Sequence, residues 1–160
     1  MNDIFDTILN KFKEDVEKSD SNNVLYIKNV ANWLNIGKFL HDDENLKFNY
    51  LMSISSYDLG DSVKFGLAYN FYSTDLKHYL EVRIEFELET KISSVESIWR
   101  AADWHEREAF DMMGIKFINH PYMKRILLPE DWKGYPLRKN YVTPEYYNGM
   151  PVPKDKSYWE

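Results

Sequence analysis

Two stretches in which apolar and polar side chains alternate constrain the fold of this chain most. Apolar side chains occupy every second position from Val63 to Phe71 and again from Leu80 to Leu88. In the second stretch, the intervening positions out to residue 89 carry four Glu and one Arg. Strict alternation over this length is typical of β-strands with one buried face and one wet face. We therefore expect a β-sheet that keeps one face in water.

Short turns join these stretches to each other and to a third apolar segment at residues 48–58, which predicts an antiparallel meander of three strands. A further short strand is expected at residues 24–28. Apolar side chains at helical spacing predict amphipathic helices at residues 3–18 and 30–41. The predicted fold class is α+β: an antiparallel β-meander packed against N-terminal helices, followed by a short helix and an extended Pro- and aromatic-rich C-terminal arm.

The short helix is expected over residues 103–113, after another at residues 94–101. Asp103 and Glu106 have the spacing of a capping box, and Gly114 can end the helix in the left-handed conformation. Arg107 and Asp111, four residues apart, are expected to pair along the helix. Charges lie all around this helix, so we expect packed neighbours over much of its circumference. These five residues are predicted to brace the fold.

The chain beyond this helix has a different composition, and we predict a core domain at residues 1–113 with a docking segment and arm at residues 114–160. Residues 1–113 carry 12 Lys/Arg against 21 Asp/Glu, whereas residues 114–140 carry 6 against 2. An acidic body with one basic strip argues against nucleic-acid binding. It favours docking of the strip against an acidic partner surface. The expected arm carries four aromatic side chains, which are Tyr146, Tyr147, Tyr158 and Trp159.

Catalytic and metal chemistry finds little support in the residues. The chain has no Cys, which excludes thiolate ligation of an iron–sulfur cluster by this chain. His105 and Glu106 resemble the start of a zinc-binding helix, but Ala109 stands where the second His would be. No Gly-rich phosphate loop occurs. We also expect no secretory signal and no membrane span, because no charged leader or long apolar run is visible. A small acid–base enzyme that uses His105, Glu106 and Glu108 stays open as an alternative function.

Two neighbouring segments carry a family resemblance: WHEREAFDMMGIKFINHP, and then KRILLPEDWKGYPLRKN. Together they resemble the signature of the C subunit of bacterial NADH:quinone oxidoreductase, which is respiratory complex I. Related subunits occur in energy-converting membrane-bound hydrogenases, and the equivalent subunit of such a hydrogenase is the first alternative to a complex I subunit. The specific match covers roughly residues 94–153. The family's PLRKD reads PLRKN here, so that Asn140 occupies the acidic position.

The resemblance implies a function for the chain as one part of a larger enzyme. It would be a hetero-oligomeric, peripheral subunit on the cytoplasmic side of the cell membrane, placed mainly against the D subunit and also near the B and I subunits. The holoenzyme would use FMN, iron–sulfur clusters, NADH and quinone, and would couple electron transfer to proton translocation. This chain itself is expected to bind no cofactor or metal and to have no catalytic residue.

The expected contribution of the chain is therefore mechanical. Arginines in a Pro-ordered loop suit bidentate contacts with carboxylates, and Tyr and Trp are enriched at protein interfaces. The residues predicted to form the subunit interface are Arg125, Arg138, Lys139, Trp132, Tyr135, Tyr141, Tyr146 and Tyr147.

Overall fold

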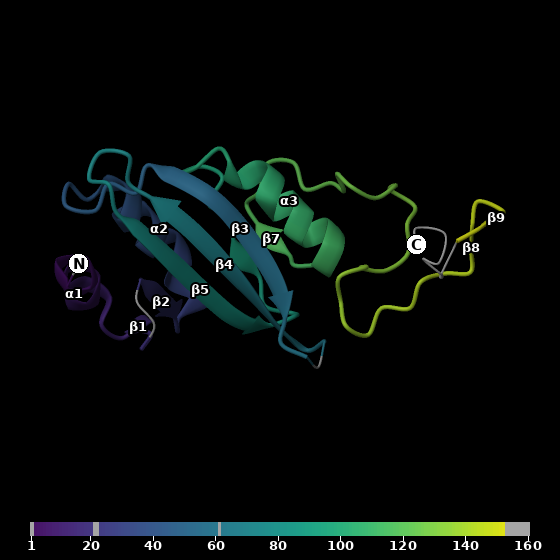
Figure 1. Cartoon of the computed structure of the whole chain (residues 1–160), viewed down its shortest axis with the longest axis horizontal. Coiled ribbons are helices and arrows are strands. Elements are labelled where there is room, and N and C mark those ends of the chain that lie inside the picture. The colour runs from purple at the N-terminus through teal and green to yellow at the C-terminus, as the bar shows by residue number, and fades with distance from the viewer. Residues whose placement is uncertain (1, 21–22, 61, 153–160) are drawn as a thin grey trace, which may run out of the picture.

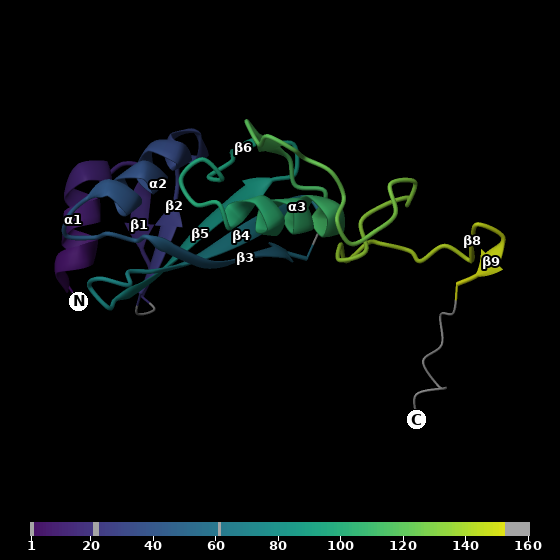
Figure 2. The same ribbon diagram turned by 90° about the horizontal axis from the view of Figure 1, so that it is seen from above.

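The computed structural model describes residues 2–20, 23–60 and 62–152 and contains one five-stranded sheet with its helices on one face (Figures 1 and 2). Tyr158 and Trp159 of the expected arm lie outside the described residues. The strand order in the sheet is β1-β2-β5-β4-β3. The mixed α+β fold agrees with the prediction from the sequence.

The meander forms the larger part of this sheet. It consists of β3 (Tyr50–Asp58), β4 (Lys64–Tyr72) and β5 (Tyr79–Glu87), which pair antiparallel in sequence order. Each inward side chain of β5 is buried, and the outward positions are half-buried or exposed. This confirms one dry and one wet face, because a period of two separates the two sets of side chains.

Two short N-terminal strands extend the sheet beyond β5. The strand β2 (Val24–Ile27) pairs parallel with β5, and β1 (Val16–Lys18) pairs antiparallel with β2. The predicted helix at residues 3–18 is therefore too long, since α1 ends at Phe12 (Asn2–Phe12). Val16 fits a helical spacing, but it is buried as the partner of Ile27, and this strand pairing decides its conformation.

Three helices cover the dry face, as Figure 2 shows. They are α1, the helix α2 (Trp33–Asp42) with a short 3₁₀ turn η1 (Val30–Asn32) before it, and α3 (Ala102–Met113). Between α2 and the sheet, the Trp33 ring lies 4.8 Å from the Tyr69 ring. The Trp99 ring lies 4.5 Å from that of Phe71. Large fully buried aromatic side chains therefore make the centre of the core.

The predicted helix at residues 94–101 is wrong, because this segment forms successive turns. Its polar groups are engaged by distant parts of the chain: the Ser94 N–H donates to the Ile118 carbonyl, and the Trp99 indole donates to the Phe48 carbonyl at 2.7 Å. Nearby, β6 (Ile92–Ser93) pairs parallel with β7 (Phe117–Ile118). This pairing joins the segment before α3 to the segment after it. These contacts hold α3 against the sheet.

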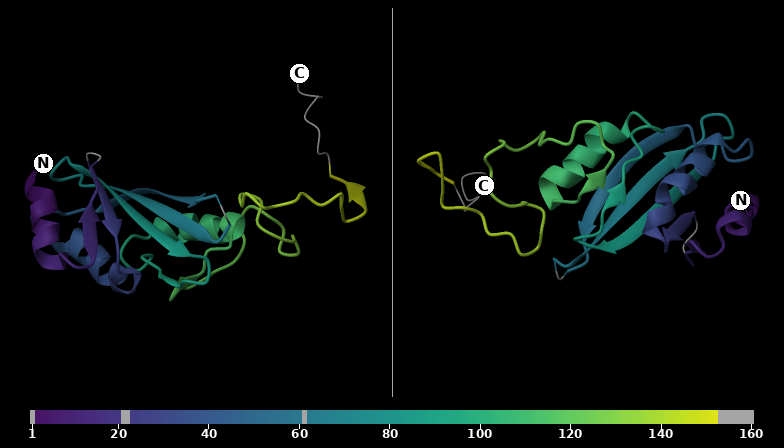
Figure 3. Two further views of the ribbon diagram at one scale, coloured as in Figure 1. Left: turned by 90° about the horizontal axis from the view of Figure 1, so that it is seen from below. Right: turned by 180° about the vertical axis from the view of Figure 1, so that it is seen from behind.

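After β7 the chain runs outward, away from the five-stranded sheet, without long regular elements (Figures 1 and 3). A small hairpin of β8 (Tyr146–Tyr147) and β9 (Met150–Pro151) lies at the outer end. We call residues 129–152 the arm. Figure 3 shows it projecting away from the end of the molecule that carries α1.

Candidate functional site

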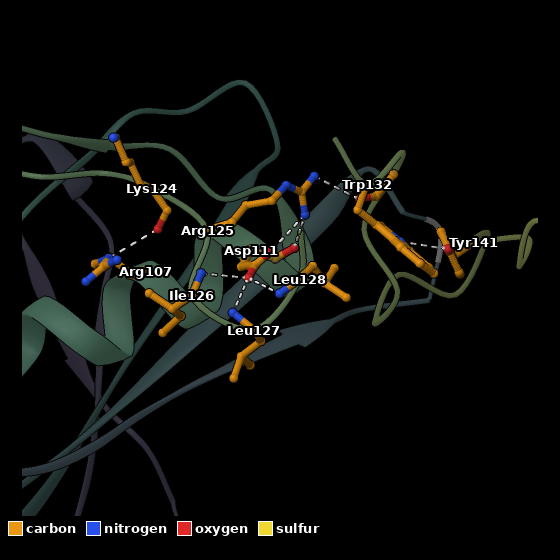
Figure 4. A network of polar contacts seen from close by, with 10 residues as sticks. Arg107, Asp111, Lys124, Arg125, Ile126, Leu127, Leu128, Trp132 and Tyr141 are labelled. Atoms are coloured by element: carbon orange, nitrogen blue, oxygen red, sulfur yellow. Dashed lines mark hydrogen bonds and ion pairs between the residues drawn. The ribbon is translucent and has the colours of Figure 1, made fainter. Parts of the chain in front are cut away.

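A buried carboxylate at the end of α3 attaches the C-terminal segment to the core (Figure 4). Asp111 is fully buried. One of its oxygens accepts backbone N–H groups of Ile126, Leu127 and Leu128 at 3.0, 2.8 and 3.0 Å, and the other accepts from Arg125 Nη1 at 2.6 Å. Burial acts to raise its pKa, but these donors outweigh burial and lower it. Asp111 therefore folds the 125–128 loop around itself.

The pair predicted between Arg107 and Asp111 is wrong, since Asp111 forms its ion pair with Arg125. Arg107 turns outward instead, and its Nε donates to the Lys124 carbonyl at 3.1 Å (Figure 4). Four-residue spacing allowed the helical pair. The buried position of Asp111 favoured a partner from the loop that covers it.

A second attachment lies at Gly114, directly after α3. Gly114 adopts φ 74°, which confirms its predicted role as the left-handed end of the helix. A Cβ there would lie 2.7 Å from the Tyr135 ring, so the position also needs the absence of a side chain. Arg138 Nε donates to the Met113 carbonyl at 2.7 Å, and its guanidinium lies over the Tyr135 ring at 4.3 Å.

A third attachment joins the arm to the end of β3. Asp58 accepts the Lys139 N–H at 2.9 Å, the Gly60 N–H at 2.8 Å and the Ser62 hydroxyl at 2.9 Å. Burial acts against ionisation, but these donors lower the pKa of Asp58 to about 2. The Asn140 backbone N–H donates to the Ser62 hydroxyl at 3.3 Å, while Asn140 itself is exposed. No sequence pattern distinguishes Asp58, because an acidic residue before a turn is common.

Further out, the aromatic residues of the arm contact one another. Trp132 Nε1 donates to the Tyr141 hydroxyl at 3.1 Å, and the Trp132 and Tyr147 rings lie 5.0 Å apart. The Tyr147 hydroxyl donates to Asp131 at 2.9 Å. An open cleft of about 370 Å³ lies among these side chains and is also lined by Tyr146. The arm thus carries its own aromatic cluster, away from the core.

Large apolar side chains on and before the arm remain in water. At least 54% of the surface of each of the following is exposed: Leu127, Leu137, Val142, Tyr146 and Met150. Three of the predicted interface residues, Arg125, Tyr135 and Arg138, instead pack together, because the Tyr135 ring also lies 5.3 Å from the Arg125 guanidinium. Lys139 and Tyr146 are exposed.

The capping box predicted from Asp103 and Glu106 is wrong. The helix begins one residue earlier at Ala102, and its N-cap residue makes no side-chain cap. Glu106 is fully buried and accepts hydrogen bonds from the Ser94 hydroxyl at 2.6 Å and the Val95 N–H at 2.8 Å. Burial raises its pKa to about 7, although those two donors act in the opposite direction. Glu106 therefore braces the turn before α3 from the side, not the helix end.

A buried histidine lies beside this carboxylate. The Tyr122 N–H donates to His120 Nδ1 at 3.1 Å, across the turn that contains Pro121. Because Nδ1 is an acceptor, the proton of the neutral ring is on Nε2, which lies 3.3 Å from Asp103 and 4.0 Å from Glu106. Burial lowers the pKa of His120. Among the described residues, neither His120 Nε2 nor Asp103 Oδ1 makes a hydrogen bond, so these groups lie close together without a direct bond.

The geometry does not assemble the alternative acid–base site. Glu106 points into the core, whereas Glu108, two residues further along α3, is exposed. Two residues advance a helix by about 200°, so the carboxylates face opposite directions. Within residues 2–20, 23–60 and 62–152, the acidic and His side chains form no group that could hold a metal ion. In the same ranges, no helix has the length and apolar character needed to span a membrane.

Comparison with known proteins gives consistent relatives. Residues 27–147 match the family described as respiratory-chain NADH dehydrogenase, 30 Kd subunit. The C subunit of NADH-quinone oxidoreductase from Chloroherpeton thalassium is 45% identical over 139 residues, which are 84% of this chain and 58% of that protein. The same subunit of Chlorobium phaeobacteroides is 40% identical over 142 residues, 86% of each chain. The chain thus spans less than two thirds of the first of these relatives.

Solved structures add a likeness of fold. A chain in the structure of the membrane-bound sulfane sulfur reductase, an archaeal respiratory membrane complex, superposes with a TM-score of 0.68 at 22% identity. The match covers 88% of this chain and 85% of the other. At this identity, the match shows a shared fold.

Proposed function

This chain belongs to the family of the 30 kDa subunit of respiratory-chain NADH dehydrogenase, and we propose that it serves as the non-redox C subunit of an NADH-quinone oxidoreductase. In this role it lies in the peripheral arm of the complex, on the cytoplasmic side of the membrane. It braces the D subunit at the quinone site, with the B and I subunits as further neighbours. NADH oxidation, electron transfer to quinone and proton translocation then belong to the assembled enzyme, with its FMN and iron–sulfur clusters.

The observation that carries this proposal is an anchored segment with exposed apolar side chains. Its base is held by the buried carboxylates Asp111 and Asp58, while Val142 is 81% and Tyr146 67% exposed. Apolar surface of this kind on a projecting arm is unfavourable in a lone monomer and marks an interaction site. The fixed base lowers the conformational entropy lost when the arm docks. A partner surface is therefore the expected environment of the arm.

The charge of the segment indicates the character of that surface. Residues 114–140 carry 6 Lys/Arg against 2 Asp/Glu in a chain of net charge −6. An acidic region of the partner complements this strip and suppresses pairing with basic surfaces. Arg125 and Arg138 contribute by ordering the strip, because their side chains bond to α3. Lys139, whose side chain is exposed, contributes charge.

A non-redox role agrees with the residue composition. The chain has no Cys, so it cannot supply the thiolates that hold iron–sulfur clusters. A second candidate is the equivalent subunit of another respiratory membrane complex, such as a membrane-bound hydrogenase. The likeness in fold to a chain of an archaeal respiratory membrane complex supports this second candidate. The two candidates differ in the proteins that co-purify with the chain.

Surface substitutions on the arm test the proposal without disturbing its anchors. We expect the triple change Leu137→Ser, Val142→Ser, Tyr146→Ser to leave the melting temperature of the full chain unchanged and to reduce recovery of the D subunit with a tagged chain. Removal of residues 142–160 should have the same effect while the far-ultraviolet circular dichroism of the sheet persists. Leu76→Ser is the matched control, since Leu76 is 43% exposed in the β4–β5 turn at the opposite end of the sheet.

Two results would contradict the proposal. Undiminished recovery of the partner by the triple variant would show that the arm is not a docking element. Unfolding of the truncated chain would show that the arm belongs to the core. NADH-quinone activity of membranes from the same strains should decrease together with recovery, because the chain acts through assembly.

A further inference from the structure

A second exposed surface, on the outward side of α3, combines two aromatic rings with two cations. We call Trp104, Arg107, Tyr122 and Lys124 the α3 patch. We propose that the α3 patch binds a carboxylate-bearing segment of a neighbouring protein in the complex, separately from the arm. This inference rests on the proposed function in one respect only, which is that the chain works within a larger complex.

The Arg107 side chain is held in one orientation. Its Nε donates to the Lys124 carbonyl at 3.1 Å, as the dashed line in Figure 4 shows. Its guanidinium carbon lies 5.2 Å from the Trp104 ring and 5.3 Å from the Tyr122 ring. Among the described residues, no hydrogen bond or ion pair involves its terminal nitrogens Nη1 and Nη2. A guanidinium fixed in this way presents two N–H donors to a carboxylate with little further loss of entropy.

The two rings beside Arg107 are unusually exposed for their size. Trp104 is 63% exposed and Tyr122 is 54% exposed. Each ring makes a cation–π contact with Arg107, which contributes modestly in water. Covering the rings would remove apolar area from water and strengthen the contact to Arg107 by desolvation. Trp, Tyr and Arg together form the side-chain set most enriched among residues that dominate protein binding.

The cations of the patch are Arg107 and Lys124, and both lie beside the Tyr122 ring. The Lys124 ammonium lies 4.9 Å from the centre of that ring, and contact with Tyr122 raises the pKa of Lys124, so this side chain carries its charge. Among the nearby carboxylates, Asp111 bonds to Arg125, Asp103 faces His120, and Glu108 is exposed one position after Arg107 on α3. Glu130 also acts to raise the pKa of Lys124. A carboxylate placed between Arg107 and Lys124 would be attracted by both cations.

A protein segment fits this surface better than an anionic membrane or a nucleic acid. Membrane binding by charge typically needs clusters of about 4–8 Lys/Arg, whereas the patch has two cations in a chain of net charge −6. A stacked, planar guanidinium between aromatic rings instead gives directional recognition of one or two carboxylates. The occupant we infer is therefore an Asp- or Glu-containing loop or terminus of another protein of the complex.

Site-specific photocrosslinking within the complex tests the inference. A full-length tagged chain carrying p-benzoylphenylalanine at Trp104 is expressed in cells that make the complex, irradiated and purified with its partners. We expect a crosslink to a peptide that contains Asp or Glu. Arg107→Glu should lower its yield roughly tenfold, as for loss of one bidentate charged contact. Replacing the partner's carboxylate by Arg should restore the yield in the Arg107→Glu background. Lys38→Glu is the matched control, because Lys38 is exposed on α2 and changes the net charge equally.

Because Arg107 also bonds to the Lys124 carbonyl, a second variant protects the test from a folding defect. Trp104→Glu leaves that bond intact and should weaken association in unmodified complexes, with an unchanged melting temperature of the chain. Unchanged association of both Arg107→Glu and Trp104→Glu chains, or a crosslink only to a peptide without Asp or Glu, would overturn the inference. So would flotation of the chain with vesicles of phosphatidylcholine and about one third phosphatidylserine that depends on Arg107. If the wild-type chain co-purifies with no other protein of such a complex, the proposed function fails instead.

Discussion

Glu106→Gln is expected to remove a pH dependence that the buried Glu106 carboxylate imposes on folding. The side chain is fully buried, and its pKa is raised by burial from 4.5 to about 7. The folded state thus holds the proton more tightly than the unfolded chain does. The stabilisation from this proton is fully present below pH 4.5 and is lost as the pH rises through 7. This difference between 4.5 and about 7 corresponds to about 3 kcal/mol of stability.

Gln keeps the shape and the acceptor oxygen for the Val95 N–H, and its amide can donate to the Ser94 hydroxyl. Other titrating groups oppose or overlap the effect of Glu106. His120, whose pKa is lowered, contributes stability that is lost as the pH falls below 6.5. Asp103 also faces this cluster. The informative quantity is therefore the difference between wild type and variant at each pH, in which the contribution of His120 largely cancels.

Urea unfolding followed by circular dichroism between about pH 4.5 and 8.5 measures this difference across the titration of the carboxyl. As the pH rises through this range, the free energy of unfolding of the Glu106→Gln chain should increase by about 3 kcal/mol relative to wild type. This corresponds to roughly 6–12 °C in melting temperature for a chain of this size. Glu87→Gln, at an exposed position of β5, is the matched control. A difference for Glu106→Gln that does not change with pH would refute the reasoning, because it would mean that Glu106 titrates normally.

Three further substitutions test the bracing contacts. Asp111→Asn should cost about 3 kcal/mol, as for a broken buried ion pair, and should speed hydrogen exchange of the 126–128 amides; unchanged exchange there would contradict the anchor. Gly114→Ala should lower stability by more than about 1 kcal/mol, because φ is 74° and the new Cβ would meet a ring; an unchanged thermal midpoint would count against this. Glu106→Ala should destabilise the chain by about 2–4 kcal/mol, because it leaves a cavity and unpaired donors. The control Glu87→Ala should change stability by less than about 0.5 kcal/mol. Equal chemical denaturation midpoints for the two variants would show that Glu106 is solvated.

The charged side chains of α3 differ in whether they are buried. The helix carries Glu106, Arg107 and Asp111 within a short span, and the sequence shows no face that is clearly apolar. The structure separates these charges: Glu106 and Asp111 are buried with partners from other segments, while Arg107 faces outward. This arrangement agrees with the expectation of packed neighbours around much of the helix. Both specific pairings predicted from residue spacing, the Asp103–Glu106 capping box and the Arg107–Asp111 pair, were wrong.

The local sequence pattern was sufficient to predict the meander strands and the end of α3. Alternation in β4 and β5 follows from a two-residue period, which every strand with one buried face must show. Gly114 was identifiable because few other residues adopt positive φ at the end of a helix. The family could also be recognised from a local feature, the contiguous segment at residues 104–140, and the match to residues 27–147 bears this out.

Only the tertiary structure decided the partners of the buried polar groups and the fate of the short elements. Asp111 meets Arg125 fourteen residues away, and Asp58 meets Lys139 eighty-one residues away, so no local spacing could indicate either contact. Val16 became a strand residue because β2 supplied its hydrogen bonds, although its spacing also suited a helix. A buried donor or acceptor must be satisfied by whichever group the folded chain brings within reach. For that reason the sequence predicted the elements and the basic strip, and the packed chain selected the residues that anchor the strip.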